Sequence, residues 1–342
     1  MTKWTLQART RGGQYLATLP FFDLQGEFFM NKPKQIRWSL PLRHEVITMK
    51  SVFPGKTEVW LLRNDQKVFV GPLWNATASS KDNTLACDGQ SVESYLSLRR
   101  INADVEKSGS RSDIAWSLIN DTQSENSGDL GITAGTLSVT PSMTTKYARG
   151  EGIYVFDAID EFASEADDGF DWEIDVDRVF NTYYPRIQSR ARVRLEYLGN
   201  ITQYSLQAMG MWEANDILIK GPDDSLSQVT VDTVKRAEYG LRQYTGSNTS
   251  AKTQTQLNNY AQDILNKRRD IRLVPQVSVR TDNINPFEGD ITIGQLSHLY
   301  IDDSWAQFDQ DMRMTGFQVT VGRHGEETFV LYLSDLREVD GE

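Results

Sequence analysis

Residues 57–74, TEVWLLRNDQKVFVGPLW, restrict the folds open to this chain. Two runs rich in β-branched and aromatic residues, 57–63 and 67–74, flank the polar triplet Asn64-Asp65-Gln66. Such runs favour extended strands, and a short polar connection between them is typical of a β-hairpin. A third run, TLACDG at 84–89, follows closely. The N-terminal part is therefore predicted to form an antiparallel sheet.

The alternation within this hairpin predicts which side chains face the core. Successive side chains of a strand point to opposite faces. We expect Val59, Leu61 and Phe69 to be buried, with Trp60 and Leu62 on the other face.

Helical patterns interrupt the strands at four places. Apolar residues recur at a helical spacing, and Ser91 is a possible capping residue for the first segment. The predicted helices are a short one after Ser91, SDIAWSLIND at 112–121, the segment around 153–162, and the long segment 253–270. Further strands are predicted at about 192–198, 201–209, 215–220 and 228–233, and a second hairpin around Arg323–Glu326.

Charge is unevenly distributed along the chain. The formal net charge is −11, yet residues 1–70 hold 11 Lys or Arg against 5 Asp or Glu. This asymmetry predicts that the two parts meet different surroundings, and the acidic remainder argues against a basic nucleic-acid groove. The single cysteine, Cys87, excludes an intrachain disulfide framework. No apolar run has the length of a membrane span, so we expect synthesis in the cytoplasm and no membrane insertion.

The stretch GFDWEIDVD places four carboxylates at alternate positions. Asp171, Glu173, Asp175 and Asp177 are predicted to share one face of a strand, while Phe170, Trp172, Ile174 and Val176 face a core. A carboxylate pair could serve glycoside hydrolysis, which needs two such groups beside one bond. A solvated acidic face is the simpler interpretation of a ladder of like charges.

Motifs for other chemistry are lacking in the sequence. The three histidines lie far apart, and there is no nucleophile elbow, P-loop or dinucleotide fingerprint. We therefore predict no catalytic residues, no metal and no cofactor. The cluster LPFFDLQGEFF contains Phe21, Phe22, Phe28 and Phe29, which we interpret as a subunit interface or core, with sugar binding as the alternative.

Three features, taken in order, resemble the tail hub proteins of long-tailed phages, which are related to contractile-tail hubs and to the bases of type VI secretion spikes. The first is KVFVGPLW leading to LACDGQSVESYL, and the second is GFDWEIDVDRVFNTYYPRI. The third is TDNINPFEGDITIGQLSHLYIDD, with Gly289-Asp290 before a strand, followed by MRMTGFQVTVGRHGEETFVLYL.

This resemblance implies a mainly β fold with α insertions, built from tail-tube-like β-barrel domains. It implies a ring of three chains at the distal end of the tail tube in the virion, around the path by which DNA leaves. The expected partners are other copies of the chain, the distal tail protein ring, the tape measure protein, and downstream tail-tip or receptor-binding proteins. Phage DNA would only pass through.

On this basis the chain is predicted to be a non-enzymatic structural tail protein, whose four acids line the lumen or another surface. The alternative is a tail-associated protein that binds or cleaves glycans. The predicted segments are a first barrel segment at 1–100, an insertion at 101–169, a second β-rich region at 170–275, and a closing barrel segment at 276–342.

Overall fold

A computed structural model describes residues 2–164, 168–187, 189–221, 227–248, 253–322 and 325–334. The protein is mainly β and divides into two compact units. The larger unit combines Met1–Tyr204 with Val277–Leu333, and the smaller comprises mainly Ser205–Gln276. The chain therefore passes from the larger unit into the smaller one at Ser205 and returns to the larger one at Val277.

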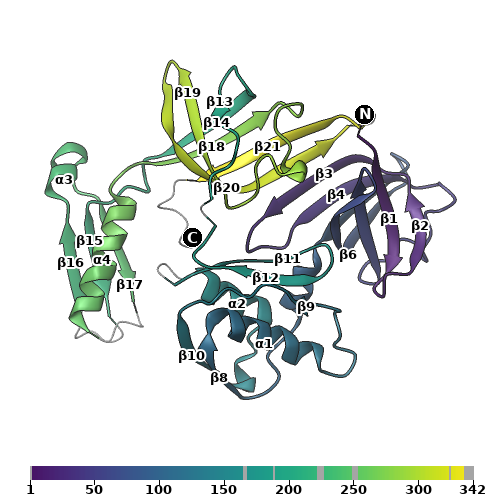
Figure 1. Cartoon of the computed structure of the whole chain (residues 1–342), viewed down its shortest axis with the longest axis horizontal. Helices are drawn as coiled ribbons and strands as arrows, with labels where there is room; N and C mark the ends of the chain where they lie inside the picture. The colour runs from purple at the N-terminus through teal and green to yellow at the C-terminus, as the bar shows by residue number, and fades with distance from the viewer. Residues whose placement is uncertain are drawn as a thin grey trace. The chain divides into compact units, whose positions relative to one another are not determined.

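A 13-stranded sheet is the main element of the structure (Figure 1). Eleven of its strands form one continuous path, and β19 (Leu296–Asp303) with β13 (Leu195–Glu196) joins it through β20. Along the described strands the path runs from β14 to β2, so this sheet is open and is not a closed barrel. The path is β14 (Ile201–Met209), β18 (Arg272–Val279), β21 (Glu327–Ser334), β20 (Ala306–Val321), β3 (Phe22–Phe29), β4 (Gln35–Pro41), β7 (Thr84–Gln90), β6 (Gln66–Ser79), β5 (Thr57–Arg63), β1 (Trp4–Thr10) and β2 (Tyr15–Leu19).

The predicted N-terminal hairpin is confirmed as β5 and β6. These strands pair antiparallel, and Asn64 and Asp65 between them both have positive φ, which matches the twist of a two-residue hairpin turn. Val59, Leu61 and Phe69 have no exposed surface. The strand β6 extends beyond the predicted run to Ser79 and also pairs with β7.

An aromatic core joins β3, β20 and β21. The rings of Phe28 and Phe317 are stacked with centroids 4.8 Å apart, and Phe287 meets both of them edge-on. Phe28 is only 3% exposed. Of its two predicted roles, core or subunit interface, the burial of this ring by its own chain supports the core.

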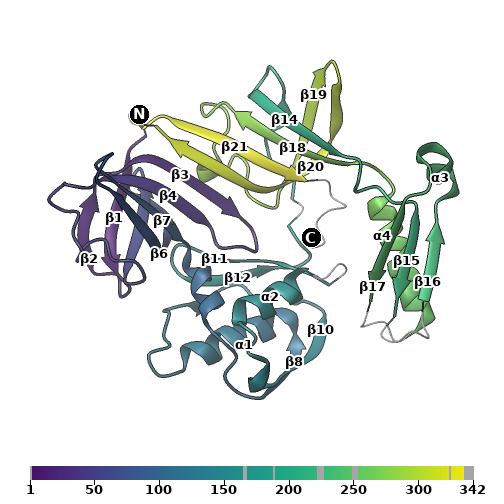
Figure 2. The same ribbon diagram turned by 180° about the vertical axis from the view of Figure 1, so that it is seen from behind.

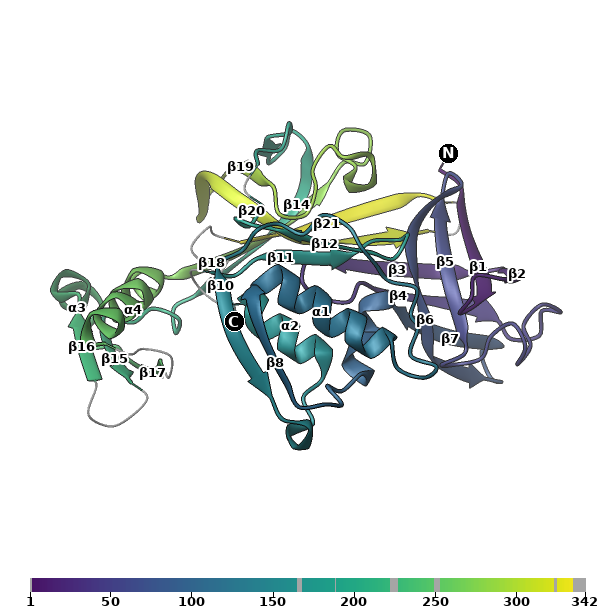
Figure 3. The ribbon, with the colours of Figure 1, turned by 60° about the horizontal axis from the view of Figure 1, so that its bottom comes forward.

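Residues 92–184 form a helical lobe inserted after β7 (Figures 1 and 3). Its core contains Trp172, the largest fully buried side chain among the described residues, together with Phe162 and Phe180. The predicted helices at 112–121 and 153–162 correspond to α1 and α2. The lobe consists of η1 (Val92–Leu98), β8 (Val105–Ser110), α1 (Arg111–Gln123), β9 (Thr133–Ala134), β10 (Ser142–Tyr147), η2 (Arg149–Glu151), α2 (Val155–Ser164), β11 (Asp171–Ile174) and β12 (Val179–Tyr183).

Two local predictions need correction. The helix after Ser91 is the 3-10 helix η1, and the Ser91 hydroxyl accepts from the backbone amide of Lys34 instead of capping it. The helix η3 (Pro286–Glu288) ends just before Gly289, bends and a turn follow, and the next strand begins only at Leu296. In the final hairpin, Arg323 and His324 lie outside the described residues.

The smaller unit, seen from both sides in Figures 1 and 2, is an α/β arrangement with its own core. Three strands follow the order β16-β15-β17, and α4 packs on the face that carries Ile217 and Ile219. The long predicted helix is confirmed, with Leu257, Ala261 and Leu265 buried. The elements are β15 (Asp216–Lys220), β16 (Ser227–Val231), α3 (Thr233–Tyr239), β17 (Gln243–Ser247) and α4 (Gln254–Arg268).

Candidate functional site

The acidic strand predicted from the sequence forms β11 and the turn that follows it. Phe170, Trp172 and Ile174 are buried as predicted. The acids between them do not form a free ladder, because they meet cations or backbone amides from several parts of the larger unit. We call these acids and their partners the acidic latch: Asp171, Glu173, Asp175 and Asp177 with Arg313, Lys34, Glu93 and Lys67.

Asp171 is fully buried, which contradicts its prediction as part of a solvated face. One of its carboxylate oxygens accepts from the Arg313 guanidinium of β20 and, at 2.8 Å, from the backbone amide of Ile187. Arg313 is itself only 5% exposed and also donates to the Ile187 carbonyl. A buried carboxylate needs such partners, because an uncompensated charge is strongly disfavoured away from water.

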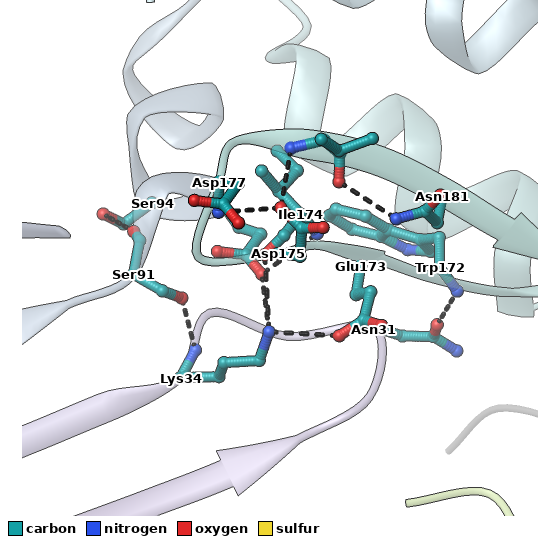
Figure 4. Close-up of polar contacts among 12 residues, drawn as sticks. Asn31, Lys34, Ser91, Ser94, Trp172, Glu173, Ile174, Asp175, Asp177 and Asn181 are labelled. Carbon is teal, nitrogen blue, oxygen red and sulfur yellow. Dashed lines mark hydrogen bonds and ion pairs between the residues drawn. The ribbon is translucent and has the colours of Figure 1, made fainter. Parts of the chain in front are cut away.

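Glu173 faces Lys34, which lies in the connection between β3 and β4 (Figure 4). The Lys34 ammonium is 3.2 Å from a Glu173 oxygen and 3.6 Å from Glu93 of η1, whose side chain is almost completely buried. It also donates to the carbonyl of Ile174 at 3.3 Å. Burial alone would lower the pKa of Lys34, but the two carboxylates outweigh it and raise that pKa above its usual value.

Tyr183 completes the surroundings of Glu173 from the neighbouring strand β12. Its hydroxyl donates to the other Glu173 oxygen at 3.1 Å. Burial and the nearby Glu173 carboxylate raise the pKa of this phenol, so it remains a donor at neutral pH.

The last two acids serve the turn between β11 and β12. One Asp175 oxygen accepts from the backbone amides of Asp177 and Val179 at 2.8 and 2.9 Å, an arrangement typical of an aspartate that closes a turn. Asp177 forms an ion pair with Lys67 of β6 and is the most exposed of the four acids, at 66% of its side chain. The alternation therefore ends at Ile174, where the strand ends.

The latch joins the helical lobe to strands that are distant in the sequence. Arg313, Lys34 and Lys67 come from β20, the β3–β4 connection and β6, and the sequence analysis identified none of them. Arg313 could have been noticed as a charged residue within the otherwise apolar run MRMTGF. Each carboxylate accepts hydrogen bonds or pairs with a cation, which suits a structural joint.

The remaining predicted interface residues are only partly buried. Phe21 and Phe22 precede and begin β3 and are half-buried, and Phe29 stacks on Tyr332 with centroids 5.2 Å apart. These three rings remain available for the predicted interface role.

Of the histidines, His44 is exposed, and His298 of β19 contacts Asp309 and Asp311 at 2.7 and 3.2 Å. His324 lies outside the described residues. The described part of the chain gathers no group of three or more His, Cys, Asp or Glu that could hold a metal ion. Within the same residues, no helix has the length and apolar character needed to cross a membrane.

The fold of this chain is similar to that of solved structures of phage tail proteins and of a type VI secretion component. One similar structure is a 43 kDa tail protein of prophage MuSo2 from Shewanella oneidensis. The two structures superpose with a TM-score of 0.72 and 14% sequence identity, over 99% of this chain and 100% of that chain. A second similar structure, a tail protein of Neisseria meningitidis MC58, has a TM-score of 0.66 and 13% sequence identity over 99% of both chains.

A third similar structure comes from a secretion system. It is a component of the E. coli type VI secretion system that is structurally similar to the T4 tail proteins gp27 and gp5, with a TM-score of 0.53 and 13% identity over 98% of this chain and 78% of that chain. No family model and no curated protein matches the sequence. The predicted resemblance is thus confirmed at the level of the fold.

Proposed function

We propose that this protein is a structural subunit of a phage tail, forming a trimeric hub at the distal end of the tail tube. The observation that carries the proposal is the match over the full length of the MuSo2 tail protein, which covers 99% of this chain and 100% of that one. A match of both chains from end to end relates the whole architecture, including the inserted lobe and the second unit.

The open sheet supports assembly into a ring. Its terminal strands on the described path, β2 and β14, each have one sheet neighbour, so each presents an edge where another chain can pair. A closed ring of identical chains needs two different contacting surfaces on each copy. In the proposed hub, sheets of three copies would join around the DNA exit path to form a barrel.

The acidic latch has a structural role in this proposal. Asp171 and Glu173 are occupied by Arg313 and Lys34, so they would fix the helical lobe to the sheet while the ring bears load. The same contacts disfavour the glycan-cleaving alternative, because a general acid must carry a transferable proton and reach a substrate. We therefore propose a non-enzymatic role.

The partners follow from the position in the tail. We propose that the half-buried rings of Phe21, Phe22 and Phe29 contact the distal tail protein ring. The tape measure protein and the tail-tip or receptor-binding proteins would lie on either side of the hub, and DNA would pass through it. The virion tail tip is the proposed location.

The experiment is to purify the full chain, measure its mass by native mass spectrometry, and label it in assembled tails by immunogold electron microscopy. The hub proposal expects three times the chain mass of 38.9 kDa and a single label at the distal end of the tube. A monomer that is absent from tails, or turnover of cell-wall glycan by the purified chain, would contradict it.

A further inference from the structure

The hairpin of β1 and β2 carries positive charge that its own chain does not neutralise. Residues 2–22 contain Lys3, Arg9 and Arg11 and no Asp or Glu. Lys3 pairs with Asp65 at 2.9 Å. Both arginines donate to backbone carbonyls instead, and neither forms an ion pair among the described residues. Their two guanidinium groups therefore remain available to a carboxylate from outside.

Apolar side chains accompany these charges at the edge of the sheet. Tyr15 and Leu16 of β2 are both exposed. The strand β2 is terminal on the described path, so no further strand of the sheet covers its outer edge. Exposed apolar side chains at an open edge favour contact with another molecule. We call Arg9, Arg11, Tyr15 and Leu16 the basic end.

A second surface, of opposite charge, lies at the connection between β19 and β20. Residues 296–311 contain four Asp and no Glu, Lys or Arg. The last two of these acids contact His298. Asp302 is exposed and forms no ion pair within the described part of the chain, and Asp303 accepts from the neutral Tyr204 hydroxyl at 2.8 Å. The connection itself is therefore negative.

Exposed apolar side chains also lie beside these carboxylates. Trp305 is 73% exposed and Leu198 is 77% exposed. Because β13 runs parallel to β19, the residues that follow the two strands lie at the same end. The nearby Arg194 is offset by Glu196, so this surface stays negative overall. We call Leu198, Asp302, Asp303 and Trp305 the acidic tip.

The two surfaces match each other, yet within one copy they lie apart (Figures 1 and 2). The net charge of −11 makes copies repel one another overall, so association requires a local match of opposite charges. Two basic ends, or two acidic tips, would bring like charges together. A contact between the basic end of one copy and the acidic tip of another brings opposite charges together.

We propose that the basic end of one copy docks on the acidic tip of the next. This inference rests on the proposed assembly of copies and names the surfaces that meet. An indole face attracts a guanidinium group, and carboxylates beside it accept its N–H groups, so Trp305 and Asp302 suit the exposed Arg11. Because the contact joins two different surfaces, repeating it closes a ring or extends a filament.

The test is a charge swap in the full chain, with self-association measured by sedimentation velocity over a range of concentrations. Arg11→Asp and Asp302→Arg should each raise the concentration at which oligomers dissociate by about tenfold or more, because each brings like charges together. Both changes in one chain should restore association. Trp305→Ala should weaken it without changing the charge. The matched control is Lys81→Asp, the same charge change at an exposed position between β6 and β7, which should associate like the wild type.

Thermal unfolding of each variant separates a lost contact from a damaged fold, and a damaged fold would not be rescued by the second charge change. Wild-type association of both single reversals, no rescue in the double variant, or a control effect as large as that of Arg11→Asp would overturn this docking and leave the trimeric hub in place. A wild-type chain that is monomeric at every concentration would also overturn it. Filaments that respond to the swap would support the docking and contradict the three-copy ring.

Discussion

At the level of single residues, the buried ion pair between Asp171 and Arg313 constrains how the chain folds. Both side chains are almost fully removed from water, and they join strands 142 residues apart in the sequence. Replacing Asp171 with Asn would leave the Arg313 charge buried without a counter-ion. We expect this change to lower the free energy of unfolding by about 3–5 kcal/mol, measured by urea denaturation.

Asp177→Asn is the matched control for this experiment. It removes the same type of charge from the same segment, but Asp177 is exposed and pairs with Lys67 at the surface. A surface pair contributes about 0–1 kcal/mol, so the control should unfold almost like the wild type. If the two variants lose similar amounts of free energy of unfolding, then the burial of Asp171 does not increase its contribution to stability.

The buried thiol of Cys87 is expected to make the stability of the protein depend on pH. Burial, and to a smaller extent Asp88, raises the pKa of its thiol from the usual 9.0 to about 12. Between these values the unfolded chain releases the proton and the folded chain retains it, so stability falls as pH rises through this window. Below it, the thiol is protonated in both states and has no such effect.

The Cys87→Ala variant lacks this contribution. Its free energy of unfolding relative to wild type should therefore rise between about pH 8 and about pH 10.5, measured by urea denaturation at both values. Because all tyrosines are kept, their own titration cancels in the comparison. A difference that does not change with pH would contradict the prediction.

Sequence patterns located several buried apolar residues but not the partners of buried charges. Trp172, Ile174 and Phe69 could be assigned from alternation, since a strand with one apolar face has only one way to bury it. Asp171 could not, because alternation shows which residues share a face and does not show what covers that face. Its cover, Arg313, comes from β20 near the other end of the chain.

At the level of elements, Lys34 connects the β3–β4 connection to β11 and η1. Its removal by Lys34→Met would leave the buried Glu93 without its cation and Glu173 with only the Tyr183 hydroxyl. We expect faster hydrogen exchange at the backbone amides of β11, because the joint between lobe and sheet loosens locally. Exchange in the hairpin β5–β6 should stay close to wild type.

The control for this prediction is Lys50→Met, which removes an exposed lysine from the connection between β4 and β5. It should change neither segment. If Lys34→Met leaves exchange in β11 unchanged, the latch does not hold the lobe. If it accelerates exchange throughout the larger unit, the lysine supports the whole fold and is not specific to this joint.

Element predictions succeeded where the local signal was complete. The hairpin β5–β6 has its turn residues, its alternation and its flanking strands within one short segment, so nothing outside 57–74 is needed to specify it. The helix after Ser91 differs because Ser91 is used by Lys34, and no local pattern reveals that a distant backbone amide will take the capping side chain. The strand order likewise depends on pairings between the two ends of the chain, as between β3 and β20.

At the scale of the whole molecule, one chain offers surfaces that a single copy does not use. The edges of the long sheet and the half-buried phenylalanines near β3 are the surfaces that the proposed ring would use. The four phenylalanines of the N-terminal cluster do not have the same surroundings. Phe28 packs against Phe287 and Phe317, whereas Phe21 and Phe22 are only half-buried by their own chain.

This difference in burial leads to different expected effects of substitution. Phe21→Ser with Phe22→Ser should leave a folded, soluble chain that is not incorporated into tails, because apolar rings at an assembly contact lose their effect when they become polar. Phe28→Ser should instead destabilise the chain by about 3–5 kcal/mol, since it empties a packed aromatic core. Circular dichroism with thermal unfolding distinguishes the two variants, and counting assembled tails by electron microscopy measures incorporation. Normal tails from the Phe21/Phe22 variant would remove these rings from the interface and leave the sheet edges as the remaining candidate for assembly.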